Sequence, residues 1–373
     1  MDTTLLKIDI GHSERILKAL DDRDKAQFIF FRIIGPRLQE RLSSLLDLKD
    51  VPSVFIHGNP HIDNYAQTDT GAGLVDFDRS RLGPYVWDIV RFISSLQLRS
   101  ADQSDWIHKK VLKSFKDGYM ATFENPDLYF STPFFIQKWG IDKKEDGIRD
   151  YVDNNGKWIK RMRKNPLPVD DERLNKILYK FLESRNDTRL LDRFELAEAG
   201  TSVGSLGKVH YIYLLEPIKG KSDRSPIILD IKECYTEEDD EWFKNPAEHH
   251  GLRMIKASNL YAPGIEQRLG HLTYKGKEMW GRQIPIHNRK IKHMLNLVEQ
   301  VDLSYCIGTQ LGRAHRRSCR NQKVSTIAKH FTKHEDLIMK TSKAIYKEVQ
   351  NAFEFFEKSK SIEKELTGFT VNE

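Results

Sequence analysis

The sequence is poor in cysteine and has no long apolar run. Its cysteines, Cys234, Cys306 and Cys319, are odd in number and show no C-x-x-C spacing, which excludes a disulfide framework and a zinc ribbon. The most apolar stretch, FIFFRIIG, is short and is interrupted by Arg32. The segment MDTTLLKIDIGHSER has no basic region followed by an apolar run. We therefore expect a soluble cytoplasmic protein with reduced thiols and no membrane partner.

A strong excess of one charge is missing as well. The chain has 60 Lys and Arg against 54 Asp and Glu, a net charge of +6. Its short basic clusters at 160–164 and 316–320 are typical of solvated helix faces. This balance suits a phosphate-bearing ligand and does not indicate nucleic acid as a partner. With 373 residues, 39% of them hydrophobic, the chain is predicted to form one bilobal unit or two domains.

The first part of the chain is predicted to form a helix and then a β-hairpin. Apolar residues recur at helical spacing over residues 12–48, before Pro52. Two strands follow, VPSVFIH and AGLVDFD, with a turn-forming TDTG just before the second. We expect these strands to pair, with a functional loop between them. From Pro84 to about residue 185 the pattern is helical.

Strand signals begin near residue 192. Five β-rich segments predict an antiparallel sheet: FELAEAG, KVHYIYLLEP, SPIILDIKECY, IEQRLGHLTY and KEMWGRQIPI. One helix, PAEHHGLRMIKASNL, interrupts them. Two long helices are predicted to follow, at about 294–317 and 323–359.

A glycine-rich turn, AGTSVGSLGKV, separates the first two of these strands. Glycines let backbone N–H groups approach an anion closely, although a plain hairpin turn shows the same pattern. The residues predicted to bind a cofactor here are Gly200, Ser202, Gly204, Ser205 and Gly207.

Lys232 stands alone between hydrophobic neighbours in the next strand, IILDIKE. A strand lysine can reach phosphates covered by a glycine-rich loop, as in protein kinases, or it can extend from a sheet edge to solvent. The first role needs a carboxylate from a neighbouring helix. Glu248 is the predicted partner and Glu241 the second choice, although a glutamate at a helix N-terminus needs no ligand to explain it.

The stretch HGNPHIDNY, followed by LVDFD, suits two kinds of site. A metal-dependent hydrolase would use His57, His61 and Asp76 as ligands. The spacing of the histidines brings them together only on a helix, whereas Pro60 and the preceding strand indicate a loop. The hydrolase is therefore the alternative interpretation, and a phosphotransferase is the preferred one.

The same stretch resembles the H-G-D-x-H-x-x-N loop and the hydrophobic-D-F-D strand of aminoglycoside kinases and related small-molecule kinases. The matching residues are His57, Gly58, His61, Asn64 and Asp76. The resemblance implies that Asn64 and Asp76, together with Asp78, hold the Mg²⁺ ions that bridge the phosphates of ATP. GPYVWDIVRF resembles the helix that follows in those kinases, whose aspartate, here Asp88, accepts hydrogen bonds from the catalytic-loop backbone.

Over most of its length the chain resembles an uncharacterised bacterial family, domain of unknown function 2252, which is grouped with the protein-kinase-like fold. The shared motifs are FIFFR, the HGNPHIDN loop, DFDRSRLGPYVWDIVR, GTSVGSLG, LDIKE, the GLRM helix, GRQ and LGRAHRRS. The catalytic loop precedes the glycine-rich loop, the reverse of ordinary kinases. The resemblance therefore implies a bilobal, kinase-like α+β fold with a permuted motif order.

Asn59 departs from the family pattern, which has an aspartate here to accept the proton of the substrate hydroxyl. An amide cannot act as a general base. The chain is then a nucleotide-binding pseudoenzyme, or Asp63 or Asp78 replaces the base, or Asn59 only positions an acceptor that is already nucleophilic. The predicted catalytic residues are Asn59, His57, His61 and Asp63.

The sequence thus predicts a kinase-like phosphotransferase that binds ATP and Mg²⁺, weakened or inactivated by Asn59. Its acceptor is a small molecule or a protein that the sequence does not identify, and the non-enzyme alternative is a nucleotide-sensing interaction protein. A helical lobe with the catalytic loop and a metal-binding hairpin is predicted over 1–189 and a sheet-rich nucleotide-binding lobe over 190–287. The helices of 288–373 are predicted to return to the helical lobe.

Overall fold

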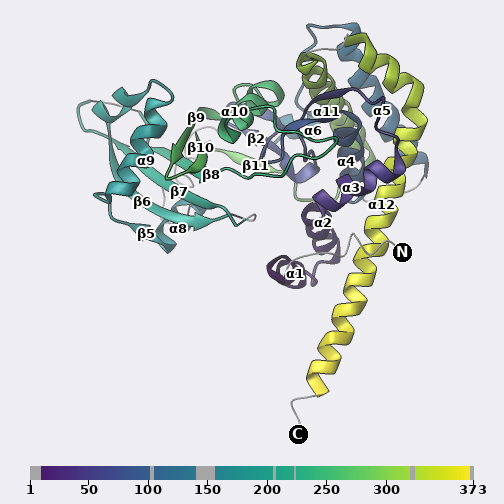
Figure 1. Cartoon of the computed structure of the whole chain (residues 1–373), viewed down its shortest axis with the longest axis horizontal. Coiled ribbons are helices and arrows are strands. Elements are labelled where there is room, and N and C mark those ends of the chain that lie inside the picture. Colours follow the sequence, from purple (N-terminus) through teal and green to yellow (C-terminus); the bar gives the residue numbers. More distant parts are fainter. Residues whose placement is uncertain are drawn as a thin grey trace.

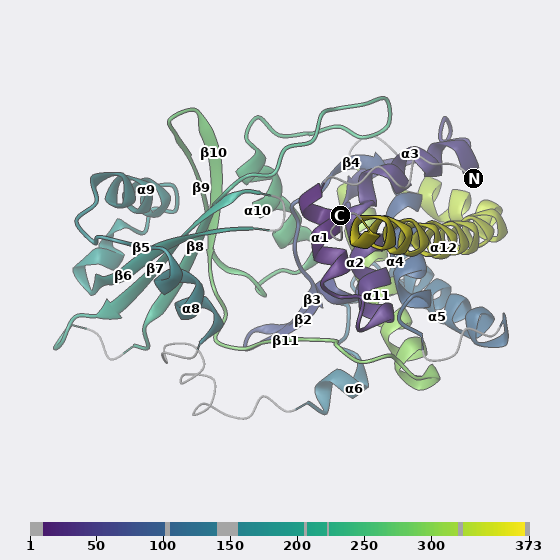
Figure 2. The ribbon, with the colours of Figure 1, turned by 90° about the horizontal axis from the view of Figure 1, so that it is seen from below.

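The protein, described by a computed structural model, has a helical lobe and a sheet lobe (Figure 1). The structure describes residues 10–100, 105–139, 156–204, 207–221, 224–319 and 324–369. Both ends of the described chain belong to the helical lobe, and the sheet lobe is formed by the middle of the chain (Figures 1 and 2).

The helical lobe contains three short N-terminal helices in place of the predicted single helix over 12–48. Asp22 caps the second of them by accepting a hydrogen bond from the Lys25 N–H, and Pro36 lies in the first turn of the third. The helices of this lobe are α1 (Ile10–Leu17), α2 (Arg23–Ile33), α3 (Gly35–Leu45), α4 (Val86–Gln97), α5 (Asp105–Glu124), α6 (Phe134–Gln137), α11 (Leu297–Ser318) and α12 (Val324–Phe369). None of the helices in the described ranges is both long and apolar enough to cross a membrane.

The strands of the helical lobe pair differently from the prediction. β1 (Ser53–Ile56) pairs with β4 (Arg81–Pro84), and β2 (Tyr65–Thr68) forms the hairpin with β3 (Gly71–Leu74). The predicted pairing of VPSVFIH with AGLVDFD is therefore wrong, because an additional strand, YAQT, follows the loop and takes AGL as its partner. A single 3₁₀ turn, η2 (Ile62–Asn64), joins the loop to this hairpin.

The sheet lobe has one antiparallel sheet of six strands, in the order β5-β6-β7-β8-β10-β9. The five predicted strands are all present. The bounds are β5 (Pro166–Leu167), β6 (Phe194–Val203), β7 (Val209–Pro217), β8 (Ile227–Glu233), β9 (Gln267–Tyr274) and β10 (Lys277–Gln283). The helix α10 (His250–Tyr261) connects β8 to β9, and after β10 the short strand β11 (Asn288–Lys290) joins β2 in the helical lobe.

Two helices that precede β6 in sequence pack on opposite faces of the sheet. α8 (Lys157–Lys164) packs on the face that carries Ile212, and α9 (Glu172–Glu183) packs on the face that carries Tyr213. Adjacent residues of a strand point to opposite faces, so the two helices cover both sides of β7. Apolar side chains of both helices are therefore buried against the sheet, although the helices precede residue 190, where the sheet lobe was predicted to begin.

Candidate functional site

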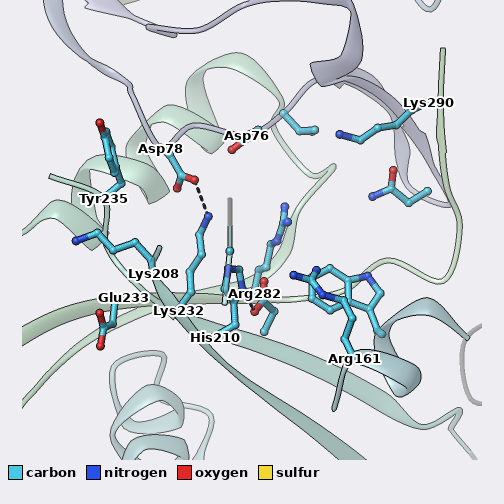
Figure 3. Close-up of a pocket in the computed structure, with 15 residues that line it drawn as sticks. Asp76, Asp78, Arg161, Lys208, His210, Lys232, Glu233, Tyr235, Arg282 and Lys290 are labelled. Atoms are coloured by element: carbon cyan, nitrogen blue, oxygen red, sulfur yellow. Dashed lines mark hydrogen bonds and ion pairs between the residues drawn. The ribbon is translucent and has the colours of Figure 1, made fainter. Parts of the chain in front are cut away.

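A cavity of about 210 Å³ lies between the two lobes. The sheet lobe contributes Gly204, Lys208, Lys232 and Arg282 to its lining, and the helical lobe side contributes Asp76, Asp78 and Lys290. Figure 3 shows Asp76 and Lys290 on one side of the cavity, with Lys232, Arg282 and Arg161 opposite. The cavity therefore brings carboxylates of the DFD segment to the lysine of the sheet.

Asp76 lies two residues after the end of β3 and has an unusual backbone conformation, with φ of 75°. Asp and Asn adopt this left-handed region more readily than other residues that have a β-carbon, and such strain is concentrated at functional sites. Burial alone would raise the pKa of the Asp76 carboxyl group. The charges of Lys232, Lys290, Arg32 and Arg282 outweigh burial and hold this pKa below its usual value.

Lys232 forms an ion pair with Asp78, with 2.7 Å between Nζ and Oδ2. Burial alone would lower the pKa of Lys232, but the charges of Asp78 and Asp76 outweigh burial and raise it. The predicted partner, Glu248, is wrong: it is exposed and lies before α10, which begins at His250 after a cap by His249. Asp78, which was predicted to be a metal ligand, forms this ion pair with Lys232 in the structure.

The residues of the glycine-rich turn that were predicted to bind a cofactor do not all line the cavity. Gly204 lines the cavity, and a β-carbon there would lie 2.7 Å from His210 Nε2. Gly200 instead packs against the backbone carbonyl of Met162 in α8 and does not line the cavity. Ser202 and Gly207 also lie outside the cavity lining, and Ser205 is outside the described residues.

Asp88 anchors the backbone of the HGNPH loop. Its carboxylate accepts hydrogen bonds from the N–H groups of His57 and Gly58, at 2.7 and 2.9 Å. The hydroxyl of Tyr261 and Nε2 of His315 also contact it, at 3.2 and 3.1 Å. The expectation that Asp88 bonds this loop is confirmed, and the loop is held rigidly because this carboxylate is fully buried.

Gly58 is expected to be essential for the loop. Its φ is 82°, and a β-carbon there would collide with the carbonyl oxygen of Arg79. Gly220 has a φ of 80° with open space around it, so Gly220→Ala provides the matched control. We predict that Gly58→Ala lowers the free energy of unfolding in urea by more than Gly220→Ala, for which strain alone costs about 1–3 kcal/mol. Equal losses in the two variants would contradict the close approach of Gly58 to Arg79.

Asn59 is held by the guanidinium group of Arg91. The amide oxygen of Asn59 accepts hydrogen bonds from Arg91 Nε and Nη2, at 3.1 and 3.0 Å. The carbonyl oxygen of Asn59 accepts one from Asn64 Nδ2 at 3.1 Å. The amide oxygen of Asn64 is buried, and no group in the described ranges donates to it. This orphaned oxygen is an available ligand for a hard cation.

The two histidines of the loop do not form a metal site. His57 is fully buried between the rings of Phe77 and Tyr261, and His61 packs edge-on against Phe28. Burial is the largest cause that lowers the pKa of both imidazoles, which are therefore neutral. Among the residues that the structure describes, no three His, Cys, Asp or Glu side chains are grouped as metal ligands. The hydrolase interpretation thus has no three-ligand site.

Asp63 and Asp78 are both engaged in ion pairs and are poor substitutes for a catalytic base. Asp63 Oδ1 accepts from Arg99 Nη2 at 2.9 Å, and Oδ2 accepts from Arg32 Nη1 at 3.3 Å. Asp78 Oδ2 is paired with Lys232. Proton transfer to Asp63 would first require one of its pairs to break, whereas at Asp78 the positive charge of Lys232 disfavours the protonated form of the carboxylate.

Sequence reasoning missed several residues of the cavity and the loop. Arg161 was attributed to a solvated helix face, yet it lines the cavity beside Trp158 and stacks over its ring at 4.9 Å. Arg91 and Arg282 were present in the WDIVR and GRQ motifs, but no role was assigned to them. Lys290 had no sequence signal, because it reaches the loop only through the pairing of β11 with β2.

Part of the helical lobe is similar to known phosphotransferases. Residues 12–121, which include the HGNPH loop, Asp76 and Asp88, match the APH phosphotransferase enzyme family. This match supports a kinase-like phosphotransferase at a coarse level. Searches of curated proteins and of solved structures found no match. Residues 140–359, more than half of the chain, match the family of uncharacterised proteins conserved in bacteria that is called DUF2252, and the chain belongs to this family.

Proposed function

We propose that the protein binds ATP with Mg²⁺ in the cavity between the lobes and is a kinase-like phosphotransferase weakened by Asn59. One observation carries this proposal: Lys232 of the sheet and the carboxylates of Asp76 and Asp78 line the same cavity, beside a glycine of the β6–β7 turn. A glycine-rich turn, a lysine on a nearby strand, and acidic metal ligands are the parts that kinases use to hold nucleotide phosphates.

The proposed fold is the kinase arrangement with the chain order permuted. The glycine-rich turn joins β6 to β7, Lys232 lies on β8, and α10 follows it. The catalytic loop, in contrast, comes first in the chain and is completed by α11 and by the β11 pairing with β2. This arrangement supports a permuted motif order, because the two lobes meet at the cavity although their motifs occur in reverse order.

Asn64 and Asp76 are the residues that would hold Mg²⁺. Both offer side-chain oxygens. The amide oxygen of Asn64 is buried and has no donor in the described ranges, and nearby cations favour the ionised form of the Asp76 carboxylate. Bound there, Mg²⁺ would supply positive charge that neutralises the phosphate oxygens. The chain itself supplies Lys232, and Lys208, Arg161 and Lys290 add positive charge at the cavity wall.

A nucleotide-sensing protein without transfer activity is the second proposal. The observation that favours it is the pairing of both carboxylates named as substitute bases: Asp63 with two arginines and Asp78 with Lys232. Asn59, held by Arg91, cannot accept a proton. Both proposals predict ATP binding, and they differ in whether ATP is consumed.

We predict that ATP with Mg²⁺ raises the melting temperature and that Asp76→Asn removes the magnesium dependence of this shift. Asparagine suits the left-handed φ of position 76, so the variant loses charge without added backbone strain. Differential scanning fluorimetry with ATP, with and without Mg²⁺, measures the effect. Asp127→Asn, a change in an exposed turn, is the control and should respond like the parent.

Two results would contradict this proposal. A parent protein that shows no ATP response refutes nucleotide binding. A shift produced by Zn²⁺ alone, and lost in both His57→Ala and His61→Ala, would favour the metal-dependent hydrolase instead.

A further inference from the structure

We infer that the acceptor of the phosphoryl group is a small hydroxyl-bearing anion, with a carboxylate or a phosphate, that binds beside the catalytic loop at Arg32. Its hydroxyl oxygen would form the new bond to the γ-phosphorus of ATP as the bond to the bridging oxygen breaks, ADP would leave, and the hydroxyl proton would pass to solvent. This inference rests on the proposed function and adds the chemical class of the second substrate. Arg32 lies near the end of α2, and Figures 1 and 2 both show α1 and α2 on the side of the helical lobe nearest the sheet lobe.

Positive charge surrounds the loop on this side. Arg32, Arg91, Arg99 and Lys290 all contact loop residues: Arg32 and Arg99 the Asp63 carboxylate, Arg91 the Asn59 amide, and Lys290 the Asp63 carbonyl at 2.9 Å. Asp63 is the only carboxylate among these contacts. Two further carboxylates lie nearby: Asp88 bonds the loop backbone, and the charge of Asp76 acts on Lys290. Four cations then face three carboxylates, an excess of one, and the asparagine at position 59 leaves this excess larger than an aspartate would.

The positive charges around the loop also affect the pKa of His61. Burial lowers the pKa of its imidazole well below the usual value, and the charges of Arg32, Arg91 and Lys290 lower it further. Three separate elements, α2, α4 and β11, thus bring cations close to one loop residue. Such a concentration of like charge destabilises the fold unless a ligand of opposite charge compensates it.

Arg32 has free donors for such a ligand. Its side chain is 29% exposed, and within the described ranges only Nη1 is used, in the pair with Asp63. A guanidinium fork whose remaining N–H groups face solvent is suited to a planar carboxylate or a phosphate. Arg99, by comparison, is 12% exposed and covers the ring of Phe28, so it supports Asp63 and is less accessible to a ligand.

The nucleotide does not account for Arg32. The cavity has its own cations, Lys208, Lys232, Arg161, Arg282 and Lys290, whereas Arg32 is not part of its lining. Arg32 is nevertheless close enough to lower the pKa of Asp76 through its charge. It therefore lies near the proposed metal ligand but outside the lining of the cavity, and this is where we place the acceptor. A polycationic acceptor such as an aminoglycoside would be repelled there.

The test uses the full chain with its nucleotide cavity saturated by a non-hydrolysable ATP analogue and Mg²⁺. Inorganic phosphate and succinate are titrated at constant ionic strength, with spermidine as the cationic probe, and thermal stability is measured. We expect saturable stabilisation by one or both anions. In Arg32→Gln the apparent dissociation constant should rise at least about tenfold, because a charge-assisted contact is lost. Arg32→Lys should retain part of the response.

Arg37→Gln is the control, since Arg37 is on α3 and pairs with Glu40 on the surface. Asp63 keeps its contact with Arg99 in Arg32→Gln, and urea unfolding checks that the fold is intact. Stabilisation by spermidine, or an equal anion response in Arg32→Gln and Arg37→Gln, would overturn the acceptor assignment alone. Absence of any shift with the ATP analogue would overturn the proposed function, and the acceptor assignment with it.

Discussion

Asn59→Asp is expected to raise the rate of ATP turnover about a hundredfold to ten thousandfold, with little change in ATP affinity. A carboxylate at this position restores a group that can accept the proton of the attacking hydroxyl, and the change is nearly isosteric. The backbone of the loop is fixed by Asp88 through His57 and Gly58. The new carboxylate should therefore occupy the place of the present amide.

Arg91 determines the state of this new carboxylate. The Arg91 groups Nε and Nη2 now bond the Asn59 oxygen at 3.1 and 3.0 Å. They would form an ion pair with the carboxylate that replaces the amide. The pair would depress the folded-state pKa of the new group below the unfolded value of about 3.9. The group is then ionised at neutral pH. Both Arg91 donors bond a single oxygen, so the second carboxylate oxygen stays free to accept a proton, unlike Asp63, both of whose oxygens are paired. Its stabilisation of the fold is complete above the unfolded pKa and is lost as pH falls through the folded pKa.

The measurement is ADP release, with and without a cell extract as the source of acceptor, together with melting temperature at pH 7 and below about pH 4, the unfolded pKa of an aspartate. Asn351→Asp, an exposed change on α12, is the control and should alter neither. A variant that binds ATP but turns it over no faster than the parent, even with extract, would show that Asn59 is not the missing base. A parent that already works at ordinary kinase rates, roughly 1–100 s⁻¹, would refute the inactivation hypothesis.

The sequence predicts those features of this protein that depend on local pattern. Five of the six strands of the sheet, the turn at Gly204 and the lysine at 232 were visible as alternation, turn chemistry and an isolated charge. The partner of Lys232 was not. Asp78 reaches it from a segment 154 residues earlier in the chain, and no local signal distinguishes that carboxylate from a glutamate near a helix.

Strand pairing and buried cations were missed for related reasons. The segment YAQT is too short to be recognised as a strand by its alternation, and it becomes one only because AGL lies beside it. Arg91 was predicted only as part of a helix motif, yet it is buried over the ring of Phe31, with 3.7 Å from the guanidinium carbon to the ring centre. A charged residue in a helical pattern is usually exposed. The burial of Arg91 against the loop depends on tertiary packing, which the local sequence does not show.

Lys232→Met is expected to abolish most of the stabilisation by ATP. Ligand at a hundred times its dissociation constant stabilises the parent by about 2.7 kcal/mol. Loss of a charge-assisted contact worth about 1.5–3 kcal/mol weakens binding roughly 10- to 150-fold. At the same ATP concentration the stabilisation should fall to about 0.3–1.3 kcal/mol. Lys113→Met, at a surface lysine of α5 that pairs with Asp117 and is 71% exposed, should leave the ATP response unchanged.

The pairing with Asp78 allows a sharper test of what Lys232 does. In Lys232→Met the carboxylate of Asp78, freed of its partner at 2.7 Å, faces the cavity and repels the phosphates of ATP. The double variant Lys232→Met with Asp78→Asn removes this repulsion. We therefore expect it to bind ATP more tightly than the single lysine variant, yet more weakly than the parent. If Lys232 only holds Asp78 in place and never contacts a phosphate, the double variant should match the parent in titration calorimetry with ATP and Mg²⁺, and the assignment of this lysine fails.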